Sequence, residues 1–258
     1  MRGAVAAIAV CAASARADVP GVADADLIAR RLVLDGSELE LDATLEVSLA
    51  TSPFARPTSL APDLWWGVTP RLTIGLTHSL ASVDQIGAGA SLCVRTAELG
   101  CDRLYRGSNL DARYLAYDTG ALAIAPRARF LVRDVDPVKP AVTLGATLRW
   151  RRGRVAIAAD PFVQLGLENR AAGNRSQLWL PVYLEVAPAC AWLLALHTGW
   201  NAALVTIGDD WHVPLALSAR VAATRSVDAA LEVGFATLGG PQNNVKQRAA
   251  MLTLAWHD

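Results

Sequence analysis

Residues 38–49 alternate polar and apolar side chains without a break, from Glu38 to Leu49. Successive side chains of a β-strand point to opposite faces, so this segment predicts a long strand with one wet face and one apolar face. A helix would instead place Glu38 and Leu41 on the same side. A chain built on this pattern is expected to fold as a sheet.

The same alternation returns along the rest of the chain. Ten further segments carry it, at 72–79, 109–117, 121–132, 141–150, 154–167, 177–186, 191–200, 212–221, 228–238 and 248–257. With a short strand at 64–68, the pattern predicts about twelve strands, an even count that suits a bacterial membrane barrel with both termini on the periplasmic side.

The predicted connections also alternate between short and long. Short ones fall at 69–71, 118–120, 151–153, 187–189 and 224–226, and long ones at 50–63, 80–108, 133–140, 168–176, 201–210 and 239–245. Short turns at one end and long loops at the other are typical of an outer-membrane barrel. A soluble β-sandwich has no reason to sort its loops in this way.

Alternation alone does not separate a soluble barrel, with its apolar face inside, from a membrane barrel, with that face towards lipid. The chain is 53% hydrophobic, with a mean hydropathy of +0.28. Most of its eight tryptophans fall near predicted strand ends, as at the interfaces of a membrane barrel. A soluble core also places tryptophan at strand ends, but four acids on the first strand favour the membrane alternative.

The N-terminus has the three parts of a secretory signal. Met1-Arg2-Gly3 is followed by an apolar stretch at 4–13 and by Ala15-Arg16-Ala17. We expect cleavage after Ala17, a periplasmic segment at 18–35 and a barrel at 36–258; a frayed apolar tail is the alternative. The mature chain would carry 22 basic and 24 acidic residues. That balance gives no basic surplus for nucleic acid.

Residues 60–76 combine a strand, a tight turn and a second strand around Trp65, Trp66 and Pro70. In this stretch the chain resembles porin-like outer-membrane barrel proteins of Gram-negative bacteria. The resemblance implies an all-β, closed antiparallel transmembrane barrel, surrounded by outer-membrane lipid and lipopolysaccharide and inserted by the barrel-assembly machinery. Such proteins usually end on an aromatic residue, whereas here Trp256 is followed by His257 and Asp258.

The cysteines predict one disulfide. Cys93 and Cys101 lie close together in the long predicted loop 80–108, and export implies an oxidising compartment. A zinc site is less favoured because no histidine lies nearby. Residues 87–92 begin like a dinucleotide-binding fingerprint but lack its third glycine and a following helix. We therefore expect neither a metal site nor a cofactor.

The charged residues of the polar face are the candidate lining of a pore. The alternation points two groups into the lumen: the acids Glu38, Glu40, Asp42 and Glu46, and the bases Arg113, Arg127, Arg129, Arg149 and Arg154. Walls of opposite sign set up a transverse field that orients small dipolar or anionic solutes, which favours a narrow passive channel. The alternative is that these charges pair and close the lumen, leaving a structural or adhesive barrel that acts through its extracellular loops.

An enzyme is the least favoured function. His78 and Ser79 are the tempting pair, but neighbouring strand residues point to opposite faces. The His-x-Ser spacing in which outer-membrane lipases resemble one another is missing at all four histidines. We therefore expect no lipid hydrolase.

Overall fold

A computed structural model describes residues 26–49, 58–79, 92–93, 105, 107–241, 243–245 and 247–258. Within these ranges the helices are two short 3-10 turns, η2 (Leu27–Ala29) and η5 (Arg170–Ala172). The strands are β1 (Leu39–Ser48), β2 (Thr58–Thr69), β3 (Leu72–Thr77), β4 (Leu92–Cys93), β5 (Ser108–Tyr114), β6 (Tyr117–Asp118), β7 (Leu122–Val135), β8 (Val138–Arg152), β9 (Val155–Ala159), β10 (Phe162–Gly166), β11 (Gln177–Ala189), β12 (Trp192–Ala203), β13 (Trp211–Ala222), β14 (Val227–Gly239) and β15 (Arg248–His257).

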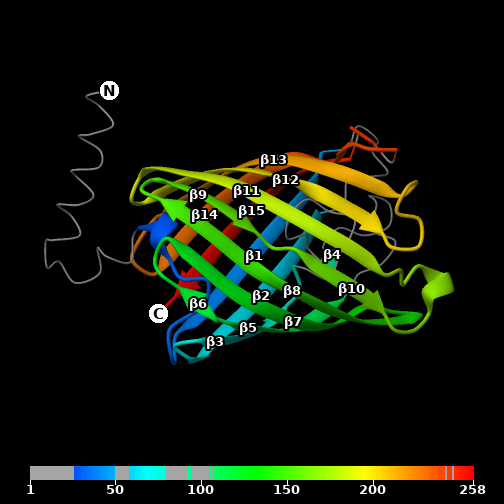
Figure 1. Cartoon of the computed structure of the whole chain (residues 1–258), viewed down its shortest axis with the longest axis horizontal. Coiled ribbons are helices and arrows are strands. Elements are labelled where there is room, and N and C mark those ends of the chain that lie inside the picture. Colours follow the sequence, from blue (N-terminus) through cyan, green and yellow to red (C-terminus); the bar gives the residue numbers. More distant parts are fainter. Residues whose placement is uncertain are drawn as a thin grey trace, which may run out of the picture.

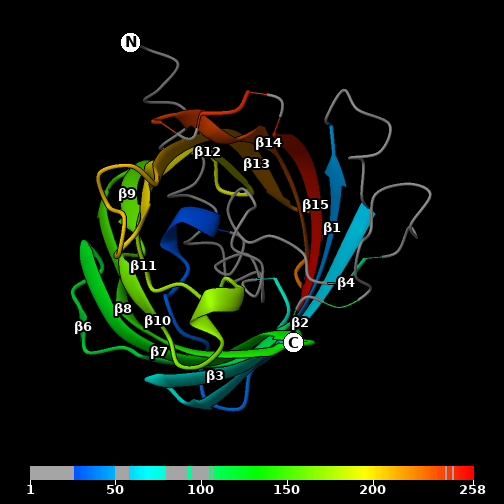
Figure 2. The same ribbon diagram turned by 90° about the vertical axis from the view of Figure 1, so that its right-hand side faces the viewer.

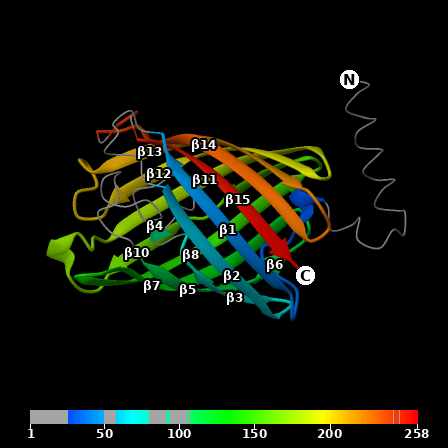
Figure 3. The ribbon, with the colours of Figure 1, turned by 180° about the vertical axis from the view of Figure 1, so that it is seen from behind.

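The strands close into an antiparallel barrel (Figures 1 and 3). Neighbouring positions of the wall follow the order of the chain, and β15 pairs with β1 to complete the ring. Two positions in the wall are each shared by two short strands. β5 and β6 both pair with β7, and β9 and β10 both lie between β8 and β11. The two-residue strand β4 pairs with β2 and is not counted as a separate position. The result is the predicted barrel of twelve strands.

Several predicted connections differ from the structure. β2 begins at Thr58, so the predicted loop at 50–63 is shorter, and β4 pairs with β2 from within the predicted loop at 80–108. The predicted loop at 133–140 is a tight turn at residues 136–137 between two long strands. The strand predicted at 154–167 is interrupted after Ala159, where Pro161 has no N–H to give to the ladder.

The apolar face of the alternation lies outside. In β1, Leu41 and Leu45 are exposed whereas Thr44 and Glu46 are buried. The other strands follow the same rule, with exposed large side chains such as Leu110, Phe130, Leu144, Leu184, Leu217, Leu231 and Leu252. A soluble barrel would bury these side chains, so the structure has the polarity of a membrane barrel.

One end of the barrel carries the short turns, such as those at 69–71 and 153–154; we call it the short-turn end. A ring of outward aromatic side chains lies next to these turns, formed by Trp66, Tyr114, Tyr117, Trp150, Trp192 and Trp256. Aromatic belts of this kind sit at membrane interfaces. Trp65 and Trp179 depart from the predicted interfacial role because both line an internal cavity. In the described part of the chain, no helix is long and apolar enough to cross a bilayer.

Leu45 lies in mid-strand between two other apolar residues, Leu60 on β2 and Leu252 on β15. We expect Leu45→Arg to destabilise the folded barrel by about 2–4 kcal/mol in lipid, the cost of a charge near the bilayer midplane. Glu40→Arg, on the same strand but facing inward, should cost less than half as much. Urea unfolding of both variants in lipid vesicles measures the difference, and equal losses would contradict the assignment of the two faces.

Candidate functional site

The lumen contains a cavity of about 320 Å³ at mid-barrel. Three kinds of side chain line it: the acids Glu40, Asp42, Asp63 and Asp160, the bases Arg113, Arg127 and Arg129, and the aromatic residues Trp65, Phe162, Trp179 and Tyr183. We call this cavity the central cavity. It is the candidate constriction of the barrel.

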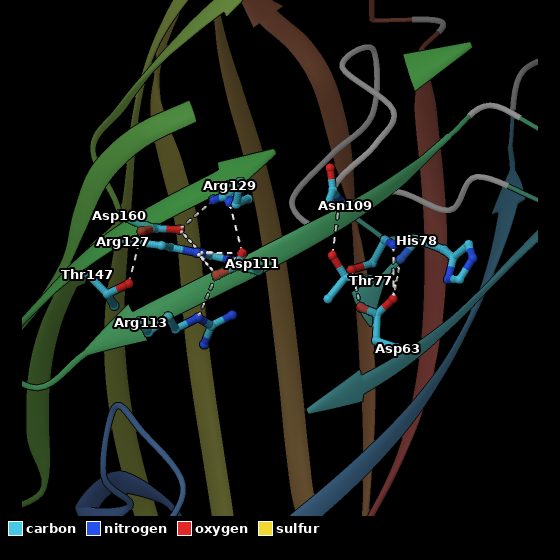
Figure 4. A network of polar contacts seen from close by, with 11 residues as sticks. Asp63, Thr77, His78, Asn109, Asp111, Arg113, Arg127, Arg129, Thr147 and Asp160 are labelled. Carbon is cyan, nitrogen blue, oxygen red and sulfur yellow. Dashed lines mark hydrogen bonds and ion pairs between the residues drawn. The ribbon is translucent and has the colours of Figure 1, made fainter. Parts of the chain in front are cut away.

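A buried aspartate on β5 organises the basic wall (Figure 4). Asp111 is fully buried and lies opposite Arg129 of β7 in the register, while Arg113 lies opposite Arg127. Arg127 Nε donates to both carboxylate oxygens, at 3.0 and 2.8 Å, and its Nη2 donates to Oδ2 at 2.5 Å. Arg129 Nε lies 3.0 Å from the same Oδ2. One carboxylate thus holds two buried guanidinium groups.

A second aspartate completes this cluster from the other side. Asp160 lies at the interruption between β9 and β10, where it receives a 2.6 Å hydrogen bond from Arg127 Nη1 and one of 3.0 Å from the Thr147 hydroxyl. It is also 3.6 Å from Arg129 Nη2. Arg127 therefore uses all three guanidinium nitrogens on carboxylates, a charge-assisted arrangement that fixes it to the wall.

Arg113 is held differently. Its Nε is 3.7 Å from Asp111, a contact without hydrogen-bond geometry, and no group in the described part of the chain hydrogen-bonds this nitrogen. The guanidinium carbon lies 3.9 Å from the centre of the Trp65 ring, a cation–π contact. Three arginines share two aspartates, so one positive charge of the cluster is not neutralised. Arg113, the most exposed of the three, presents that charge to the cavity.

Two glycines make room for the aromatic side chains beside the cluster. Trp65 lies opposite Gly75 and Phe162 opposite Gly145 in the register, and a Cβ at either glycine would collide with the aromatic residue. Arg129 lies 4.9 Å above the Phe162 ring, which also stacks on Trp179. The aromatic residues therefore pack inward and narrow the lumen.

The acids of β1 and β2 form the adjoining wall. Asp42 and Asp63 are cross-strand neighbours, and Glu40 lines the same cavity. Asp63 accepts hydrogen bonds from the backbone N–H groups of His78 and Ser79, at 2.6 and 3.1 Å, and from the Ser79 hydroxyl. Asp42 Oδ1 is buried and has no hydrogen-bond partner within the described residues. The structure thus places Glu40, Asp42 and Asp63 next to the part of the wall that carries the three arginines and their two aspartates.

The remaining predicted site residues lie away from the central cavity. Glu46 is buried further along β1, and the Glu38 carboxylate accepts a 2.7 Å hydrogen bond from Asp35 N at the short-turn end. Arg149 donates to the Arg30 carbonyl, and Arg154 Nη1 lies 3.1 Å from Asp26. These two arginines hold the segment that precedes β1.

The sequence analysis did not identify Asp111, Asp160 or the inward Trp65. Asp111 has the same parity as Arg113, and Asp160 the same parity as Arg154, so the alternation itself contained the signal. The alternation did not show which residues pair, because side chains on neighbouring strands can be matched only when the register of the strands is known.

His78 and Ser79 take different partners in the structure. His78 Nδ1 lies 2.6 Å from the Pro62 carbonyl oxygen, while the Ser79 hydroxyl donates to Asp63. Figure 4 shows the His78 ring turned away from Asp63. A serine nucleophile needs a base within hydrogen-bond reach, and these two side chains are not arranged for that role.

Cys93 lies on β4, next to Ser59 of β2. Its predicted partner Cys101 lies outside the described residues, so the disulfide stays a prediction. Among the described residues, no cluster of three or more His, Cys, Asp or Glu side chains is arranged to hold a metal ion.

No protein-family model matches the chain, and no curated protein matches it. Solved porin structures do. A KdgM porin in complex with disordered oligogalacturonate aligns with a TM-score of 0.55 at 7% identity, covering 85% of this chain and 98% of that one. A NanC porin aligns with a TM-score of 0.57 at 7% identity, covering 84% and 98%. At this identity the likeness shows the fold, a twelve-stranded porin-like barrel.

The arginine cluster predicts unequal effects of two substitutions. Asp111→Asn leaves three arginines with only Asp160 and should destabilise the barrel by about 3–5 kcal/mol, the cost of breaking a buried ion pair. Arg113→Gln removes a partly hydrated charge and a cation–π contact and should cost about 1 kcal/mol or less. Urea unfolding followed by tryptophan fluorescence measures both, and a larger loss from Arg113→Gln would contradict this description.

Proposed function

We propose that this protein is a passive outer-membrane channel for small solutes. The observation that carries the proposal is the central cavity, where Glu40, Asp42 and Asp63 adjoin the wall of three arginines. Arg113 faces this cavity, and its 3.7 Å contact with Asp111 is not hydrogen-bonded. The same proposal includes a signal peptide at 1–17, a periplasmic segment at 18–35 and a barrel at 36–258. It also includes insertion by the barrel-assembly machinery into a membrane of lipid and lipopolysaccharide.

Polar atoms without hydrogen bonds argue for water in the lumen. Burying a polar or charged group away from water costs several kcal/mol unless a partner compensates it. Asp42 Oδ1 and Arg113 Nε lack hydrogen bonds within the described residues, and the ion pair of Arg113 with Asp111 is 3.7 Å long. Water is the partner that a channel would provide, and a hydrated lumen gives solutes a path.

The walls also suggest which solutes pass. Acids on β1 and β2 beside bases on β5 and β7 create a field across the lumen, which orients dipolar or anionic solutes. The KdgM porin with a similar fold is described in complex with oligogalacturonate. That supports a solute channel here without fixing its substrate.

A structural or adhesive barrel with a closed lumen is the second candidate. The pairing of Arg127 and Arg129 with Asp111 and Asp160 favours it, since these two arginines are occupied. We propose no enzymatic role.

Liposome swelling tests the channel directly. Vesicles containing the folded barrel should swell in isotonic solutions of small neutral sugars, and swelling should slow steeply as solute size increases, because the cavity is narrow. Rates equal to those of protein-free vesicles at every solute size would favour the closed barrel.

Arg113 is the residue expected to tune selectivity. Arg113→Glu should shift the cation-to-anion permeability ratio at least about fivefold towards cations, since each unit of charge about 4 Å away contributes about 1 kcal/mol in water and the substitution reverses the charge. Reversal potentials in a salt gradient measure this ratio. Arg175→Glu, at an exposed ion pair outside the cavity, is the matched control. Equal reversal potentials for Arg113→Glu and the wild type would contradict a role for this cavity in conduction.

A further inference from the structure

Residues 26–38, which precede β1, cross the mouth of the barrel at the short-turn end; we call them the strap. Figure 2 shows this segment inside the ring of strands. At one side of the mouth, Ile28 is buried against Ala156, Ala187 and Leu193, and Leu27 N donates to the Cys190 carbonyl at 3.1 Å. The strap therefore starts against β9, β11 and β12.

The strap ends its crossing on another part of the wall. Val33 is buried with Leu115, Ala123 and Ala125, next to β5 and on β7. Leu34 N then donates to the Thr73 hydroxyl of β3 at 2.8 Å. Only β8 lies between β7 and β9, but four wall positions separate Thr73 on β3 from Ala187 on β11, so the chain spans part of the opening between them.

Arg30 fastens the middle of the strap. Its guanidinium makes a hydrogen-bonded ion pair with Asp228 of β14, and its backbone carbonyl accepts from Arg149 of β8. Four wall positions separate β8 from β14 in one direction round the barrel and six in the other. One residue thus connects well-separated parts of the wall through the lumen.

Asp228 is the buried anchor of this contact. Its side chain is 1% exposed, and the other nitrogen atoms that face it are more distant, Arg220 Nε at 3.7 Å and His257 Nε2 at 3.8 Å. The strap itself is irregular apart from η2 and has no strand ladder to hold it. It is attached by two apolar contacts, by the ion pairs of Arg30 with Asp228 and of Asp26 with Arg154, and by single hydrogen bonds such as that of Leu34 N. A segment held in this way opens more readily than the strand ladder around it.

The strap leaves part of the mouth open. A cavity of about 680 Å³ lies between it and the barrel wall, lined by Arg30, Glu38, Arg225 and His257 among others. Glu40 lines both this cavity and the central cavity. Glu40 therefore lies between the two spaces, and a solute that leaves the central cavity at this end would pass beside the strap.

We propose that the strap is a gate built into the barrel, held shut by the ion pair of Arg30 with Asp228, and that its release widens the path. The inference rests on the proposed channel function. Since a partly buried ion pair is weakened by salt and by loss of either charge, the attached state should be favoured at low ionic strength.

Trypsin tests the attachment without relying on conduction, because release exposes the peptide bond after Arg31. Arg30→Gln, Asp228→Asn and the double variant of the folded full chain should each be cut there about tenfold faster than the wild type at low salt, the effect of losing one charge-assisted hydrogen-bonded pair. The double variant should be no faster than the single ones, since all three remove the same contact. Unchanged cleavage rates would overturn the proposal.

Asp210→Asn is the matched control because it removes a carboxylate from the exposed Arg175–Asp210 pair at the long-loop end. It should be cut at the wild-type rate; acceleration equal to that of Asp228→Asn would show a general loss of stability and overturn the proposal. Arg30→Gln leaves every barrel residue unchanged, so it stays informative if Asp228→Asn folds poorly.

Single-channel recording tests the gate itself. Arg30→Gln should at least double the wild-type conductance, and high salt should reduce the difference. Equal conductance in a conducting wild type and variant would overturn the gate while leaving the channel intact. If neither the wild type nor Arg30→Gln carries current while trypsin still cuts the variant faster, the channel function and the gating role would both be overturned. The ion pair would then serve only to attach the strap to the barrel.

Discussion

The ion pairing of Asp111 with Arg127 is the interaction on which the interior depends. A barrel that turns leucine towards lipid must place its charges inside, where each one needs a partner or water. Asp111 and Asp160 satisfy Arg127 completely and Arg129 in part, which fixes β5, β7 and the β9–β10 interruption relative to one another. Arg113 has a 3.7 Å contact with Asp111 and lies over the Trp65 ring at the cavity, so its charge remains available to a solute.

The same constraint acts at the mouth of the barrel. Asp228 is buried on β14, and the charge that reaches it from across the lumen comes from Arg30, outside the strands. In the cluster around Asp111 both partners belong to the wall, so the contact is permanent. At Asp228 one partner belongs to an irregular segment, so the contact can open without disturbing the barrel. Wall pairs thus shape the path, and the strap contact controls access to it.

The alternation of residues 38–49 and of the segments that repeat it was enough to predict a barrel of about twelve strands with its apolar face outward, because period two is a local property of extended backbone. Leu41 and Leu45 lie outside as this pattern requires. The alternation could not predict contacts between strands. Asp111 contacts Arg127 because of the register between β5 and β7, and neither segment alone determines that register. Residues 26–35 of the strap were predicted only as part of a periplasmic segment at 18–35, since they have no periodicity and their position depends on a barrel formed by the rest of the chain. Pro161 was visible in the sequence, but its effect, an interruption that places Asp160 beside Arg127, was not.

Single-channel current across a planar bilayer, recorded from the wild type and from Arg30→Gln, tests the central claim that the lumen holds a hydrated path between its charged walls. We expect discrete current steps that are small in the wild type and larger in Arg30→Gln. In a salt gradient, their reversal potential should differ from zero. A folded barrel that carries no current in either form, so that even release of the strap opens no path, would contradict it.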